Sequence, residues 1–176
     1  MSIRSNVITR RDKKLLDLCS SKETRGSYTH YFLNNEKTTL TTMLLQEVLR
    51  YQDYLNQYGN DSRKVKITGV GRYLQMKPAL EAGISYLGLN VQNIRFTDQI
   101  QDMLIIARFE QQRQYLEWKA GVISDTQFQY NLAQEFYTVP MPGALTERNS
   151  APIFGGQASH DSGTFLQEIT DIRKLG

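Results

Sequence analysis

One carboxylate with the features of a catalytic acid lies near the N-terminus, in the stretch "SSKETRGSY" at residues 20–28. Glu23 follows an amphipathic helical pattern and precedes Gly26, a residue type that often ends helices. The negative end of a helix dipole disfavours an ionised carboxylate, and a general acid benefits from that bias because it must keep a proton at neutral pH. A solvated Glu closing an ordinary helix fits the same position, so position alone leaves both interpretations open.

Other kinds of reactive site have little support in the sequence. Cys19 is the only cysteine, so no internal disulfide is possible, and a zinc site would need His30, His160 and distant carboxylates. We therefore expect no metal and no other cofactor. The formal net charge is only +3 and the basic residues are scattered apart from "RRDKK", which argues against nucleic-acid binding.

Length and composition predict one globular domain over residues 1–176. The chain is 40% hydrophobic and 22% charged, which is close to globular averages. No run approaches the roughly 20 apolar residues of a membrane span, and the N-terminus lacks the apolar core of a secretory signal. We expect a protein that is made in a cytoplasm and does not leave it through a general export pathway.

Helical patterns provide most of the predicted framework. The first begins at a capping box of Thr9 and Asp12 and is expected to end at Gly26, which puts Glu23 in its last turn. Further helices are predicted within 40–58, 78–88, 97–121, 124–140 and 164–175. A small irregular β-hairpin is predicted around "NNE" at 34–36, and residues 140–163, dense in Pro, Gly and Ser, predict an ordered loop. The fold class is α+β, mainly α.

The chain resembles phage lysozyme-like domains, the superfamily of endolysins and virion-associated peptidoglycan-cleaving proteins. Five segments carry this resemblance in order: "LLDLCSSKETRGSY", "TLTTMLLQEVLRYQ", "GRYLQMKPAL", "FTDQIQDMLI" and "GVISDTQFQYNLAQEFYTVP". Together they cover nearly the whole chain. The resemblance implies a lysozyme-like fold with its small β-hairpin region between the first two long helices.

The resemblance also implies roles for individual residues. Glu23 matches the catalytic acid, and Asp102 opens the central helix together with Gln101. Phe136 stands where the family usually has Trp. The residues implied to contact the glycan strand are Tyr28, Arg72, Tyr73, Gln75, Gln101 and Tyr137.

The implied activity is cleavage of the bond between N-acetylmuramic acid and N-acetylglucosamine in peptidoglycan. Phage lysozymes with a Glu, Asp, Thr triad would place an Asp where this chain has Phe32, and only Glu36 follows nearby. One acid fits a lytic transglycosylase better than a hydrolase with paired carboxylates. The expected place of action is the bacterial cell wall, with the protein carried in the virion tail.

Departures from the family pattern keep a second function open. Thr24 and Arg25 replace small residues, and Leu74 is inserted between Tyr73 and Gln75. The alternative is a structural tail or baseplate protein that keeps the lysozyme-like fold with weak or no activity, and other tail proteins would then be partners. For Tyr28, Tyr73 and Tyr137, packing in the core is likewise an alternative to contact with the glycan.

The inserted Leu74 leads to a geometric expectation. Side chains alternate in direction along an extended segment, so one extra residue would turn Gln75 away from Glu23 unless the backbone forms a bulge. Gly69 and Gly71 make such a bend inexpensive. We therefore expect Tyr73 or Gln75 to border the same groove as Glu23.

Overall fold

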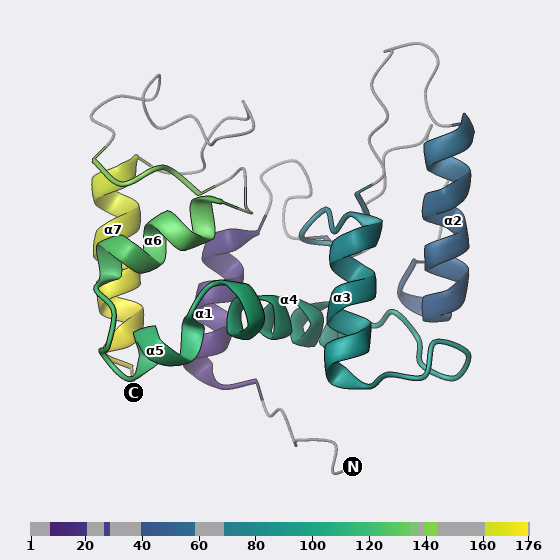
Figure 1. The fold of residues 1–176 in the computed structure, drawn as a ribbon, viewed down its shortest axis with the longest axis horizontal. Helices are drawn as coiled ribbons and strands as arrows, with labels where there is room; N and C mark the ends of the chain where they lie inside the picture. Colours follow the sequence, from purple (N-terminus) through teal and green to yellow (C-terminus); the bar gives the residue numbers. More distant parts are fainter. Residues whose placement is uncertain are drawn as a thin grey trace. The chain divides into compact units, whose positions relative to one another are not determined.

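The protein is mainly helical in the part of the chain that its structure, a computed structural model, describes (Figure 1). That part comprises residues 8–20, 27–28, 40–58, 69–134, 136, 139–143 and 161–175. The chain divides into two compact units, Met1–Asn6 with Glu23–Ala107 (unit 1) and Val7–Lys22 with Arg108–Gly176 (unit 2). One domain over 1–176 stays a prediction, and each unit is described by itself.

Unit 1 contains helices α2 (Leu45–Tyr58) and α3 (Lys77–Leu87), the first part of α4 (Asp98–Gln112) and the 3-10 turn η1 (Leu40–Thr42). Gly83 lets α3 approach α4 closely, because a Cβ atom there would lie 2.9 Å from Leu104 Cδ2. The apolar side chains buried together are Leu40, Leu45, Val48, Leu55, Val70, Leu80, Ile84, Phe96 and Leu104. These contacts fix α4, which carries Gln101, against α2 and α3 and the segment that contains Val70.

β structure within the described residues is limited to two isolated antiparallel bridges, Leu44 with Arg95 and Val70 with Gln75. No β-hairpin is seen between α1 (Arg10–Cys19) and α2 in the residues described there. Most of the predicted hairpin, residues 29–39, lies outside the described residues.

Unit 2 is built on α1, α5 (Tyr115–Lys119), α6 (Asp125–Ala133), α7 (Ser162–Arg173) and the last part of α4. Helix α7, yellow in Figure 1, packs against both α6 and α1. Trp118 is fully buried and stacks on Phe128, with ring centroids 4.4 Å apart, and Tyr115 lies at 5.7 Å from Trp118. This aromatic stack joins α5 to α6.

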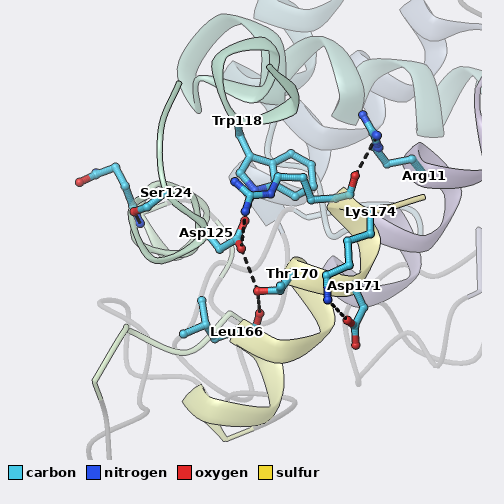
Figure 2. Close-up of polar contacts among 10 residues, drawn as sticks. Arg11, Trp118, Ser124, Asp125, Leu166, Thr170, Asp171 and Lys174 are labelled. Carbon is cyan, nitrogen blue, oxygen red and sulfur yellow. Dashed lines mark hydrogen bonds and ion pairs between the residues drawn. The ribbon is translucent and has the colours of Figure 1, made fainter. Parts of the chain in front are cut away.

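The partly buried carboxylate of Asp125 connects three helices of unit 2 (Figure 2). Asp125 accepts hydrogen bonds from Trp118 Nε1 at 2.8 Å and from Thr170 Oγ1 at 2.8 Å, and forms an ion pair with Arg173 at 3.2 Å. Arg11 of α1 also donates to the carbonyl of Arg173 at 2.9 Å. The C-terminal turn of α7 is therefore held by polar contacts as well as by packing.

Local capping signals were read correctly from the sequence. Thr9 and Asp12 form the predicted capping box, and Ser124 accepts from the amide of Gln127 at the start of α6. Gly88 ends α3 in the left-handed conformation, with φ of 64°. Helix α7 begins at Ser162, slightly before the predicted start, because Asp161 caps it.

Several predicted helices are wrong in their extent. Helix α6 ends at Ala133, well before the predicted end at Pro140, and α2 begins at Leu45, after a 3-10 turn at Leu40–Thr42. Helix α1 ends at Cys19, and Ser20 is already extended, with its hydroxyl donating to the carbonyl of Asp17. Because α1 stops before Glu23, its dipole does not support a catalytic role for that residue. The run predicted over 97–121 breaks at Gln114, which has φ of 54°. Asn131 of α6 stabilises that break by donating to the Arg113 carbonyl and to Gln114 Oε1.

The described part of the loop predicted over 140–163 consists of 140–143 and 161–163. Gln129 Nε2 donates to the carbonyl of Pro140 at 2.9 Å and lies 3.3 Å from Ser162 Oγ, so both described ends are attached to α6. None of the described helices is long and apolar enough to cross a bilayer.

Candidate functional site

Five of the predicted site residues lie in described parts of unit 1. These are Tyr28, Arg72, Tyr73, Gln75 and Gln101. Glu23, the predicted acid, lies outside the described residues, and so do Glu36 and Tyr137. The structure therefore describes the candidate site at Tyr28, in the turn that carries Arg72, Tyr73 and Gln75, and at Gln101 near the start of α4, but not at Glu23.

A tight turn presents Arg72 and Tyr73 to α4. The backbone groups of Val70 and Gln75 exchange two hydrogen bonds, at 3.1 and 2.9 Å, and close the turn. Leu74 occupies the left-handed region with φ of 49°. The inserted residue is thus accommodated inside a turn, whereas we expected a bulge in an extended segment.

Gly71 is required for the approach of this turn to α4. Its φ is 74°, and a Cβ atom there would overlap Gln101 Oε1 and lie 3.2 Å from a ring carbon of Phe96. Gly69 is equally constrained, because a Cβ atom would lie 2.6 Å from the Leu74 carbonyl oxygen. The glycines of "GVGRY" therefore serve close packing of the turn.

Asp102 is the centre of a network of polar side chains. The Tyr28 hydroxyl donates to its two oxygens at 2.9 and 3.0 Å, and the Tyr73 hydroxyl donates at 2.5 Å. Arg72 donates to the Tyr28 oxygen at 2.8 Å, and its guanidinium carbon lies 5.1 and 5.5 Å from the ring centroids of Tyr28 and Tyr73. Burial, with the hydrogen bond to Asp102, raises the pKa of Tyr73 far above its ordinary value, so this phenol stays a donor.

Gln101 ties the same segments together through their backbones. Its Nε2 donates to the carbonyls of Tyr28 at 2.9 Å and Phe96 at 3.1 Å, and its Oε1 accepts from the Arg72 amide at 3.1 Å. Gln101 is fully buried, so these bonds satisfy backbone groups that water does not reach. The start of α4, the turn and the Tyr28 segment are thereby joined.

Gln75 faces α4, and its predicted place beside Glu23 stays a prediction because Glu23 lies outside the described residues. Its Nε2 donates to the Gln101 carbonyl at 3.3 Å, and its own carbonyl accepts from Gln52 Nε2 at 2.7 Å. Gln52 was missed in the sequence. The available signal was its place between Val48 and Leu55 on the apolar face of α2, where a polar side chain needs a buried partner.

Burial limits what this network can contact. Arg72, Tyr73 and Gln75 are 7%, 6% and 5% exposed, and only Tyr28 in the network is half-buried. These buried side chains are placed to support a site, and their contact with a sugar stays a prediction.

Phe136 belongs to unit 2 and not to this network. It is 6% exposed and meets Phe109 edge to face, with ring centroids 5.4 Å apart. Within the described residues no group of three or more His, Cys, Asp or Glu side chains could hold a metal ion. The functional groups of the polar network around Asp102 are therefore phenols, amides, one guanidinium and one carboxylate.

No family model, curated protein or solved structure matches this chain. The resemblance to phage lysozyme-like domains rests on the five sequence segments alone and stays a prediction.

Proposed function

We propose that this protein has a lysozyme-like fold and cleaves peptidoglycan between N-acetylmuramic acid and N-acetylglucosamine. The observation that carries the proposal is the polar network of unit 1. It joins three segments that were matched to the family independently: the one containing Tyr28, the turn with Arg72 and Tyr73, and the start of α4 with Gln101 and Asp102. These hydrogen bonds link groups up to 74 positions apart in the sequence, which supports the proposal that the three segments form one site.

Glu23 is the proposed acid and lies five positions before Tyr28 in the sequence. It would protonate the glycosidic oxygen as the bond breaks and then, as a carboxylate, take the proton from the muramoyl C6 hydroxyl as that oxygen closes the anhydro ring. The proton given to the glycosidic oxygen leaves on the new hydroxyl of N-acetylglucosamine, and the proton taken from the C6 hydroxyl restores the acid, so neither water nor a second carboxylate is needed. The proposed place of action is the bacterial cell wall, reached from a phage tail.

The burial of Tyr73 and Gln75 favours a second candidate function. Side chains that point into the core and bond to Asp102 and Gln101 serve the scaffold, and scaffold residues persist where catalysis is lost. A structural tail or baseplate protein with a lysozyme-like fold is the alternative. Its partners would be other tail proteins.

Cleavage of purified peptidoglycan by the wild type and by two matched variants separates these functions. Glu23→Gln preserves shape and removes the transferable proton, so we expect it to abolish release of soluble fragments without loss of folding. Glu36→Gln is the control with the same chemical change, and we expect a much smaller effect. Equal damage by both would favour paired acids and hydrolysis. An inactive wild type would favour the structural function.

A further inference from the structure

Tyr28 is the member of the polar network that a bound glycan could reach. Tyr28 is half-buried, whereas Arg72, Tyr73, Gln101 and Asp102 are buried. A phenol ring that is partly exposed can lie against the apolar face of a sugar. The affinity that such a contact adds depends on whether the ring is held in place before the ligand binds.

Helix α4 holds Tyr28 at two points through consecutive residues. Gln101 binds its main-chain carbonyl at 2.9 Å, and Asp102 accepts from its hydroxyl at 2.9 and 3.0 Å. Arg72 binds the same hydroxyl at 2.8 Å and lies over the ring. Asp102 and Arg72 bind the hydroxyl and Gln101 binds the main-chain carbonyl, so both the position and the tilt of the ring are fixed.

We propose that Asp102 is a positioning residue that fixes the ring of Tyr28 for contact with the glycan strand. This inference rests on the proposed function. Asp102 is 4% exposed, so it acts through Tyr28 and does not touch the sugar. A hydrogen bond to a carboxylate is stronger than one between neutral groups, which suits a contact that holds the ring in place.

The test is a double-mutant cycle on soluble glycan strands. Asp102→Asn and Tyr28→Phe break the same hydrogen bond from its two sides, so we expect each to raise KM about tenfold with kcat near the wild-type value. The double variant should be no worse than the poorer single variant, because the proposed effect of Asp102 on the ligand passes through Tyr28, while Tyr73, which also donates to Asp102, is buried. Asp98→Asn, the same change at an exposed position of α4, should have no effect.

Multiplying losses in the double variant, or an unchanged KM in Asp102→Asn, would overturn the proposal. If Asp102→Asn does not fold, Tyr28→Phe still decides, because it breaks the same bond while leaving the buried carboxylate in place. An unchanged KM in that variant would also be contradictory.

A fluorine resonance separates failure of this inference from failure of the proposed function. In protein with 3-fluorotyrosine at position 28, Asp102→Asn should shift the resonance toward that of the unfolded chain, and Asp98→Asn should not. If the wild type does not cleave, the proposed function fails, and the dissociation constants of the same variants for glycan strands decide the inference. An unchanged resonance and unchanged binding would refute it.

Discussion

Replacing Gly71 by alanine should destabilise unit 1 by about 2 to 5 kcal/mol. A non-glycine residue in the left-handed region costs about 1 to 2 kcal/mol. The new Cβ would also overlap Gln101 Oε1, and displacing that carboxamide leaves buried backbone groups without partners, at about 1 to 3 kcal/mol. The second contribution is specific to the contact between the turn and α4.

Gly88→Ala is the matched control in the same unit. Gly88 has φ of 64°, and no atom lies within 4 Å of a Cβ built there, so only the left-handed cost applies. We expect Gly71→Ala to lower the urea midpoint by about 1 M more than Gly88→Ala. Circular dichroism of the helices is the suitable signal, because the chain's one tryptophan, Trp118, lies in unit 2.

Shortening Gln101 should remove most of the difference in stability loss between Gly71→Ala and Gly88→Ala. In a Gln101→Ala background the methyl group of Gly71→Ala no longer meets the carboxamide and only the 3.2 Å approach to the Phe96 ring carbon remains, so its cost should fall close to that of Gly88→Ala. Equal destabilisation by Gly71→Ala and Gly88→Ala in the wild-type background would refute the argument that Gly71 exists for close approach to Gln101.

Two further predictions concern unit 2. Asp125→Asn should lower the free energy of unfolding by about 2 kcal/mol and change the fluorescence of Trp118, because an amide cannot accept hydrogen bonds from all three donors. Asp171→Asn, the same change at an exposed site, should lower it less. Equal losses of stability in urea unfolding would contradict the role of Asp125. Hydrogen bonds from the Thr164 hydroxyl and amide lower the pKa of Asp161, so its stabilising effect is complete above the unfolded value of about 3.9 and is lost as pH falls through the lower folded value. Unfolding curves of wild type and Asp161→Asn should therefore converge in acid, and a constant difference down to the lowest pH would contradict this.

Helix starts and one helix end were predictable because they depend on residues close in sequence. The capping box of Thr9 and Asp12 spans one turn, and Gly88 needs no partner to adopt a left-handed conformation. The break at Gln114 was not predictable in this way. Nothing in "EQQRQYLE" ends a helix, and the bonds that stabilise the break come from Asn131 on another helix.

The candidate site was predicted as a set of residues but not as an arrangement. Sequence motifs grouped Tyr28, Arg72, Tyr73, Gln75 and Gln101, and the structure joins all five in unit 1. Two of them, Tyr28 and Tyr73, are held by Asp102, which lies 74 positions from Tyr28 and was not among the predicted glycan contacts. Pairing over that distance leaves no periodic signal in the sequence.

Mass analysis of the ends of digested glycan strands tests the central claim most directly. If the wild type acts as proposed, the released fragments end in 1,6-anhydro-N-acetylmuramic acid and are lighter by one water than hydrolysis products. Glu23→Gln should release none. Wild-type fragments with reducing ends would contradict the one-acid mechanism, and no fragments from folded wild-type protein would contradict cleavage of peptidoglycan altogether.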